Sequence, residues 1–165
     1  MPPPPSSSSA LSAPLPAADF LPHRPPLLWV DSLLAIDDHS CRCAVSLGDR
    51  FLPFLDKQHR LPAHFLLEII AQSIGVWAGW HDRQRGIPPQ SGMLLSCRNF
   101  SSAQPHFTFG DTLEIQVEKL VQDQGTGSFE GKVFLAKTAV AQATLTTYQT
   151  AWENLEKLLQ RPALP

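Results

Sequence analysis

A carboxylate lies in the middle of the most apolar stretch of the sequence, residues 61–80 (LPAHFLLEIIAQSIGVWAGW). Glu68 stands there among leucine, isoleucine, valine and tryptophan residues. An unpaired charge in apolar surroundings costs free energy, so the chain must pair this carboxylate, neutralise it or use it. A carboxyl group in such a place is suited to general acid or base catalysis, in which a positioned side chain gives or takes a proton.

Three polar residues of this stretch share one side of the predicted helix. His64, Glu68 and Gln72 follow one another at intervals of four residues, which puts them on one helical face. The other positions around the axis are mainly apolar, which is typical of a helix buried in a core. The residues alone leave two interpretations open: a structural carboxylate bonded to a neighbouring segment, or a catalytic one.

Alternating segments flank this helix on both sides. Strands are predicted over residues 27–36, 41–47, 92–99, 112–120, 128–136 and 138–148. Residues 112–120 (TLEIQVEKL) alternate apolar with polar side chains, which indicates an antiparallel strand with one solvated face. We therefore expect an α+β fold in which an antiparallel sheet wraps around one long central helix. The open edge of such a sheet favours dimerisation.

The chain divides into three predicted parts. Residues 1–17 are mostly proline, serine and alanine, and we expect a disordered arm because this composition buries little apolar surface. Residues 18–149 are expected to form one folded domain, which suits a chain of 165 residues. Residues 150–165 are expected to form a short amphipathic helix and a tail.

Composition excludes several classes of function. A net charge of -2 lacks the excess of basic residues that is typical of nucleic-acid binding. No apolar run has the length of a membrane span. Three cysteines are too few for a disulfide framework, and their spacing fits no metal template. We therefore predict reduced thiols, no metal, no cofactor and a cytoplasmic location.

Three segments resemble one enzyme family, in the same order along the chain. Residues 21–31 (LPHRPPLLWVD) resemble the L-P-H-R-x-P-x-L-L-V-D opening of the β-hydroxyacyl-ACP dehydratases. Residues 62–63 and 68–72 resemble their P-G-(four residues)-E-A-M-A-Q helix, and Gly110-Asp111 matches the end of their V-x-P-G-D connection. The resemblance spans about residues 20–148. It implies a hotdog fold and a 3-hydroxyacyl-ACP dehydratase-like protein that acts on or binds acyl thioesters in fatty-acid or polyene-type acyl chain synthesis.

The resemblance also implies roles for individual residues. In that family the helix carboxylate protonates the departing hydroxyl, which gives this role to Glu68. A histidine from the loop before the helix of the other subunit takes the C2 proton, but the family's H-F-P-G loop falls on residues 54–57, which lack it. His59 and His64 are the candidate substitutes, whereas His23 is interpreted as structural. The residues predicted to line the acyl site are Gln72, Phe54, Leu55, Phe65 and Ala63.

Three functions therefore stay open. The first is a hydro-lyase on 3-hydroxyacyl thioesters, and the second is a non-catalytic hotdog subunit that completes a dimer with an active dehydratase. The third is an acyl thioesterase, since hotdog thioesterases also direct a helix carboxylate at a water. The expected partners are acyl carrier protein or a CoA thioester, together with a second hotdog subunit in a homodimer or heterodimer.

Overall fold

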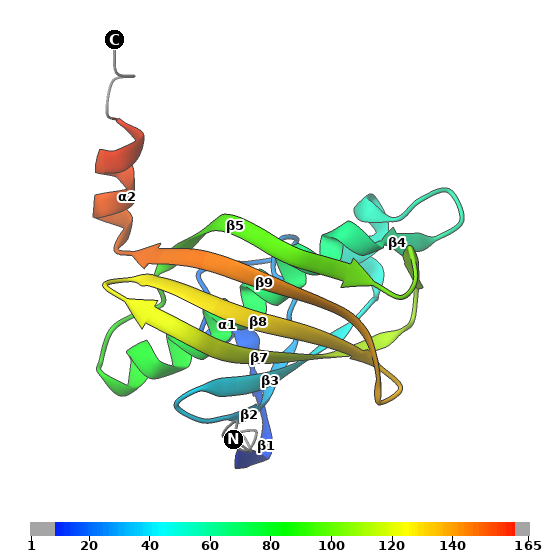
Figure 1. The fold of residues 1–165 in the computed structure, drawn as a ribbon, viewed down its shortest axis with the longest axis horizontal. Helices are drawn as coiled ribbons and strands as arrows, with labels where there is room; N and C mark the ends of the chain where they lie inside the picture. Colours follow the sequence, from blue (N-terminus) through cyan, green and yellow to red (C-terminus); the bar gives the residue numbers. More distant parts are fainter. Residues whose placement is uncertain (1–8, 161–165) are drawn as a thin grey trace.

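The computed structural model describes residues 9–160, and its centre is a long helix that lies against a curved sheet (Figure 1). The strands are β1 (Ser9–Pro16), β2 (Ser32–Ile36), β3 (Ser40–Ser46), β4 (Arg60–Pro62), β5 (Ser91–Ser102), β6 (His106–Thr108), β7 (Thr112–Asp123), β8 (Thr126–Leu135) and β9 (Thr138–Thr150). The helices are α1 (Leu66–Gln84) and α2 (Trp152–Leu159), with the 3-10 turns η1 (Ala17–Asp19), η2 (Asp49–Phe54) and η3 (Ala63–Phe65). α2 follows β9 and extends away from the sheet (Figure 1).

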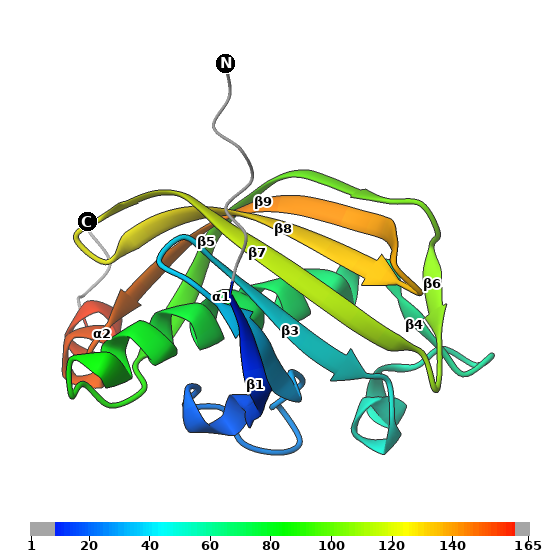
Figure 2. The ribbon, with the colours of Figure 1, turned by 90° about the horizontal axis from the view of Figure 1, so that it is seen from below.

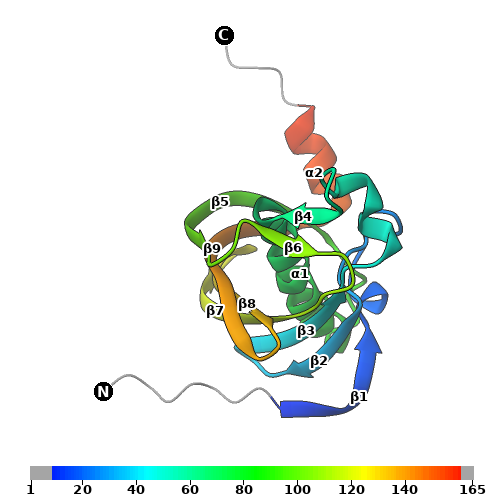
Figure 3. The same ribbon diagram turned by 90° about the vertical axis from the view of Figure 1, so that its right-hand side faces the viewer.

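Seven strands form one antiparallel sheet in the order β1-β2-β3-β7-β8-β9-β5, and β4 pairs with β6 separately. Viewed along the helix, the sheet bends around α1 (Figure 3). On β7, Leu113, Ile115 and Val117 are buried while the residues between them are half-buried, as expected for a strand with one face on the core. The predicted hotdog architecture is confirmed.

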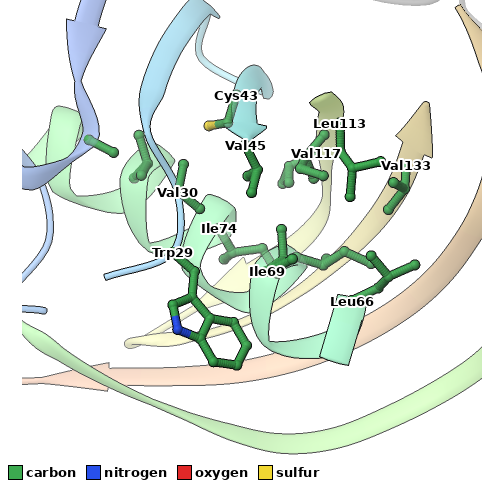
Figure 4. Packing of buried hydrophobic residues seen from close by; sticks show 14 of the residues in the cluster. Trp29, Val30, Cys43, Val45, Leu66, Ile69, Ile74, Leu113, Val117 and Val133 are labelled. Atoms are coloured by element: carbon green, nitrogen blue, oxygen red, sulfur yellow. The ribbon is translucent and has the colours of Figure 1, made fainter. Parts of the chain in front are cut away.

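One side of α1 carries the large apolar residues and packs tightly on the sheet. Figure 4 shows Leu66, Ile69 and Ile74 on the side of α1 that faces the strands. Ile70 lies so close to Gly131 of β8 that a Cβ added at Gly131 would overlap its side chain. Glycine therefore lets the helix approach the sheet at this point, and the burial of these side chains is what holds the helix in place.

The other side of α1 carries small side chains and the carboxylate of Glu68. Glu68 is exposed, and Ala71, Gly75 and Ala78 follow it along the helix as half-buried residues. Seen from below, α1 runs along the concave side of the sheet (Figure 2), which packs closely against it through β3, β7 and β8. The prediction that apolar neighbours surround Glu68 on all sides is therefore wrong for the single chain.

β1 corrects the predicted disordered arm. Residues 9–16 pair antiparallel with β2, with an irregularity between Ala10 and Leu15, whereas residues 1–8 lie outside the described residues. Leu11 and Leu15 pack against the core. The composition argument missed this strand because β2 offers backbone hydrogen-bond partners and the core offers contacts to these two leucines, neither of which depends on the proline and serine content.

Three other predicted boundaries move. The strand expected over residues 27–36 begins only at Ser32, because residues 27–29 bond to a side chain of α1 instead. The long helix begins at Leu66, because Arg60–Pro62 pair with β6 and η3 follows. The connection expected over residues 101–110 contains β6, which that pairing with β4 creates.

The sheet has two different edges. β5 is bonded to β9 on one side only and forms one edge, with Leu94 and Leu95 exposed along it. β1 forms the other edge and contains Pro14 and Pro16. An edge strand presents unpaired backbone groups to any neighbouring chain, so β5 is a surface suited to pairing.

Candidate functional site

A cavity of about 110 Å³ lies between α1, residues 21–23 and the part of the sheet formed by β8, β9 and β5. Glu68, Ala71 and Gly75 contribute to its helix wall. Met93 and Tyr148, which are paired across β5 and β9, contribute to its sheet wall. Because the helix wall has small side chains next to a single carboxylate, the cavity suits a slender, mostly apolar ligand with one reactive polar group.

Gln72 fixes the geometry beside Glu68. Its Oε1 accepts a hydrogen bond from the backbone N–H of Trp29 at 2.9 Å, and its Nε2 donates to the carbonyl oxygen of Leu27 at 2.8 Å. One partner is a donor and the other an acceptor, so only one orientation of the amide satisfies both. Buried Gln72 is therefore locked in place by the backbone of another segment.

The locked amide orients the carboxylate. The Nε2 of Gln72 donates its second hydrogen bond to Oε1 of Glu68 at 2.9 Å, one helical turn away. The other carboxylate oxygen of Glu68 has no hydrogen-bond partner within residues 9–160. Glu68 is thus held at one oxygen and left open at the other, which is the arrangement needed to exchange a proton with a ligand in the cavity.

The LPHR segment (residues 21–24) forms another wall of the cavity. The Arg24 guanidinium donates to the carbonyl oxygens of Leu21 at 2.9 Å and of His23 at 2.6 Å, which folds the segment into a compact turn. Leu21 lies against Gly75 of α1, where an added Cβ would be 2.7 Å from its Cδ2. His23 is half-buried and lines the cavity together with Glu68. The segment therefore brings a titratable ring to the wall of the cavity that Glu68 also lines.

The predicted lining residues near the helix start form a separate aromatic cluster. The Phe54 ring lies 4.8 Å from that of Trp29 and 5.6 Å from that of Phe65. Leu55 is half-buried against the core, and Ala63 is buried. None of these predicted residues lines the Glu68 cavity, whereas Gln72 does. In the single chain the site is thus built around Glu68 and Gln72.

His64 and His59 also lie outside this cavity. His64 belongs to η3, and its exposed ring lies 4.4 Å from the ring of Phe65. The four-residue spacing from Glu68 is not an α-helical one, because His64 belongs to a 3-10 turn and α1 begins only at Leu66. His59 is exposed and has a backbone φ of 57°, in a tight loop between η2 and β4.

The loop that carries His59 is held by one carboxylate. Asp56 accepts hydrogen bonds from the guanidinium of Arg60 and from the backbone N–H groups of Gln58 and Arg60. Desolvation acts to raise the pKa of Asp56, but these hydrogen bonds outweigh it and hold that pKa below its usual value. Asp56 is therefore a structural anchor of the loop.

Residues 9–160 contain no group of three or more histidine, cysteine, aspartate or glutamate residues placed to hold a metal ion. Within the same range no helix has both the length and the apolar character needed to cross a bilayer. Cys41 and Cys43 are buried, and the hydrogen bond between their side chains together with burial raises the pKa of the Cys41 thiol well above its usual value.

Sequence reasoning missed most of the cavity wall, including Met93, Tyr148 and His23. Met93 and Tyr148 meet because β5 pairs with β9, a contact between distant segments that no local pattern reveals. His23 could have been found, since it lies in the segment that resembles the dehydratase opening. Its place in that motif instead favours a structural role in sequence analysis, tying the loop to the sheet.

Comparisons with known proteins agree with this geometry. The family model described as ApeP-like, ApeP dehydratase, matches residues 15–160. The 3-hydroxyacyl-[acyl-carrier-protein] dehydratase FabZ of Methylobacterium sp. (strain 4-46) is 30% identical over 131 residues, which are 77% of this chain and 79% of FabZ.

Solved structures are similar as well. A chain of the dehydratase heterocomplex ApeI:P from Xenorhabdus doucetiae is 35% identical with a TM-score of 0.84, and the match covers 89% of this chain and 99% of that one. The PaaI protein of E. coli, from the phenylacetic acid degradation operon, is 14% identical with a TM-score of 0.53 over 70% of this chain and 80% of its own, a likeness of fold alone.

Proposed function

The chain belongs to the ApeP-like dehydratase family, and we propose that it dehydrates 3-hydroxyacyl thioesters as one subunit of a hotdog dimer. The observation that carries this proposal is the Glu68 carboxylate, which Gln72 holds at one oxygen and which opens with the other on a mainly apolar cavity. A FabZ relative that is named for dehydrating acyl-carrier-protein substrates supports the choice of acyl carrier protein over CoA as the carrier. The expected location is the cytoplasm.

Dehydration needs one acid and one base. A base removes the proton from C2, and the electron pair of that bond forms the C2–C3 double bond. The C3–O bond breaks, and the hydroxyl leaves as water with a proton from the acid. Glu68 is the proposed acid. Gln72 is a positioning residue, because its fixed amide prevents the carboxylate from rotating away from the substrate.

A second hotdog subunit is the proposed protein partner. The exposed Leu94 and Leu95 lie on the unpaired edge strand β5, and an edge strand can extend its sheet into a neighbour. The similar ApeI:P chain is part of a dehydratase heterocomplex, which supports a different subunit as well as a second copy.

The residues outside the cavity keep a proposed role across the dimer. Phe54, Leu55, Phe65 and Ala63 lie at or near the start of α1, and we keep them as candidates for the part of the acyl site that a partner completes. His59 and His64 stay candidates for proton transfer on the same condition. One observation favours the non-catalytic alternative: Phe54, at the position of the family's loop histidine, is packed between Trp29 and Phe65.

The deciding experiment offers purified protein two substrates, a 3-hydroxyacyl thioester and a saturated acyl thioester of acyl carrier protein. We expect the enoyl product from the first and no release of free thiol from the second. Glu68→Gln should abolish the enoyl product, whereas Glu114→Gln, which changes a carboxylate on the outer face of β7, should not. Thiol release that depends on Glu68 would replace the proposal by a thioesterase.

The same assay separates the active and non-catalytic alternatives. Turnover by this chain alone supports an independent enzyme. If turnover appears only after a second hotdog subunit is added, and disappears again with Glu68→Gln, the chain supplies the acid to a shared site. If the mixture keeps its full activity with Glu68→Gln, the chain is a non-catalytic subunit and the proposed role of Glu68 is wrong.

A further inference from the structure

His23 shares a cavity with the proposed acid. The sequence contains six histidines, all within the described residues, and His23 is the one that lines the cavity with Glu68. The missing loop histidine leaves the proposed dehydration without an assigned base. On the premise of that proposed function, we infer that His23 is the catalytic base of this chain, facing Glu68 across the substrate.

The His23 ring has a free nitrogen in a buried place. Its Nδ1 is shielded from solvent and has no hydrogen-bond partner in the described part of the chain. Buried polar atoms are nearly always hydrogen-bonded, and the exceptions concentrate at strained or catalytic groups. In a purely structural histidine, this nitrogen would be hydrogen-bonded to another group of the protein. Here it is left unpaired in the wall of the cavity that Glu68 also lines.

The segment that carries His23 is rigid. The Arg24 guanidinium binds the carbonyl oxygen of His23 itself, and Leu21 rests on Gly75 of α1. Leu27 is tied through its carbonyl oxygen to Gln72, the same side chain that orients Glu68. The base and the acid are therefore mounted on one hydrogen-bonded unit, which is how an enzyme keeps two groups at a fixed separation.

His23 also stands at an opening of the cavity. Pro22, His23, Gln90 and Gly92 line both the Glu68 cavity and a surface groove that includes Pro88 and Pro89. The groove connects this wall of the cavity with solvent, which gives a proton taken from a substrate a route to water. Glu68 can regain its proton from water, because its side chain is exposed in the single chain.

The chemistry balances with these two groups. The neutral ring of His23 takes the C2 proton, the released electron pair forms the C2–C3 double bond, and the C3 hydroxyl leaves as water with the proton of Glu68. The enzyme is left with protonated His23 and ionised Glu68, and proton exchange with water restores both. Gln72 cannot replace His23, since its amide is neutral and already bonded to three partners.

The test uses His23→Asn, which keeps a nitrogen close to the position of Nδ1, and His23→Ala. Turnover of a 3-hydroxyacyl thioester by the protein alone should fall about 10²- to 10⁴-fold in both variants, with melting temperatures close to that of the wild type. His39→Ala, which changes an exposed histidine outside the cavity, is the matched control and should keep its activity. The low-pH limb of the kcat/KM profile, which reports the base, should be missing from the residual activity of His23→Asn.

A second measurement does not depend on turnover. Histidine-ring NMR signals are followed while a short, unreactive enoyl thioester is added to the wild-type protein. The His23 signals should shift and those of the exposed His39, which lies outside the cavity, should not. Unmoved His23 signals in the presence of bound thioester would overturn the inference.

The outcomes separate this inference from the function on which it rests. Activity that survives Glu68→Gln overturns the proposed function. Activity that is lost with Glu68→Gln but stays within a few fold of wild type in His23→Asn leaves the proposed function standing and removes His23 as the base. A wild-type chain that is inactive alone also removes His23, because a chain that holds both groups needs no base from a partner.

Discussion

The two sides of α1 differ in what they contribute. On the sheet side, Leu66, Ile69 and Ile70 are fully buried and hold the fold together. On the cavity side, Glu68, Ala71 and Gly75 leave a space and hold a reactive group beside it. Residues one position apart in sequence thus serve stability or chemistry according to the direction in which the helix turns them. Substitutions on the two sides should therefore affect different measurements.

The largest expected effect is on the cavity side. Glu68→Gln should lower turnover about 10²- to 10⁴-fold, because the substituted amide cannot give a proton. The free energy of unfolding should change by less than about 0.5 kcal/mol, because the side chain is exposed and its size is kept. Denaturant titration beside the enzyme assay checks both parts. A large loss of stability would show that Glu68 belongs to the structural side of the comparison.

The opposite result is expected for its neighbour on the sheet side. Ile69→Ala removes a fully buried side chain that faces the sheet, and should cost about 2–5 kcal/mol of unfolding free energy. Turnover per folded molecule should stay close to that of the wild type, since Ile69 does not line the cavity. Urea unfolding measures the first quantity. A loss of turnover as large as that expected for Glu68→Gln would contradict the assignment of Ile69 to the sheet side.

Gln72 is where the two sides meet, so its removal should affect both measurements. Gln72→Ala leaves the Trp29 N–H and the Leu27 carbonyl without their partner, which should cost about 1–3 kcal/mol. It also frees the Glu68 carboxylate to rotate, which should lower kcat by up to about 10²-fold. Gln84→Ala, at the exposed end of the same helix, is the control and should change neither.

The smallest effect concerns pH and the last turn of α1. Burial lowers the pKa of His81, although its hydrogen bond to the Asp37 carbonyl acts to raise it. The unfolded chain therefore binds a proton more readily than the folded one. The stability due to neutral His81 is complete above the ordinary histidine pKa of about 6.5 and is lost as the pH falls through the lower folded value.

The melting temperature should thus fall on acidification more steeply for the wild-type protein than for His81→Gln. Turnover at neutral pH should be equal in the two proteins, because His81 does not line the Glu68 cavity. Equal slopes of melting temperature against pH in the two proteins would show that His81 does not contribute to the loss of stability at low pH.

The sequence predicts the packed side of α1 better than the cavity. The run of apolar residues around Glu68 identifies a core helix, because helical periodicity and burial are local properties of a chain. The place of His64 was not predictable from its spacing, since the helix starts two residues later, at Leu66. The wall at Met93 and Tyr148 depends on pairing between β5 and β9, which is set by the whole sheet.

The two edges of the sheet set a limit on the growth of any assembly. Pro14 and Pro16 have no backbone N–H to donate, and the pairing of β1 is interrupted between Ala10 and Leu15, so β1 is a poor template for a further strand. β5 spans twelve residues without a proline. A sheet that can pair with another chain at one edge only forms a dimer, whereas a sheet that can pair at both edges can form a continuous fibre. The prolines of β1 therefore disfavour extension of the sheet from this edge.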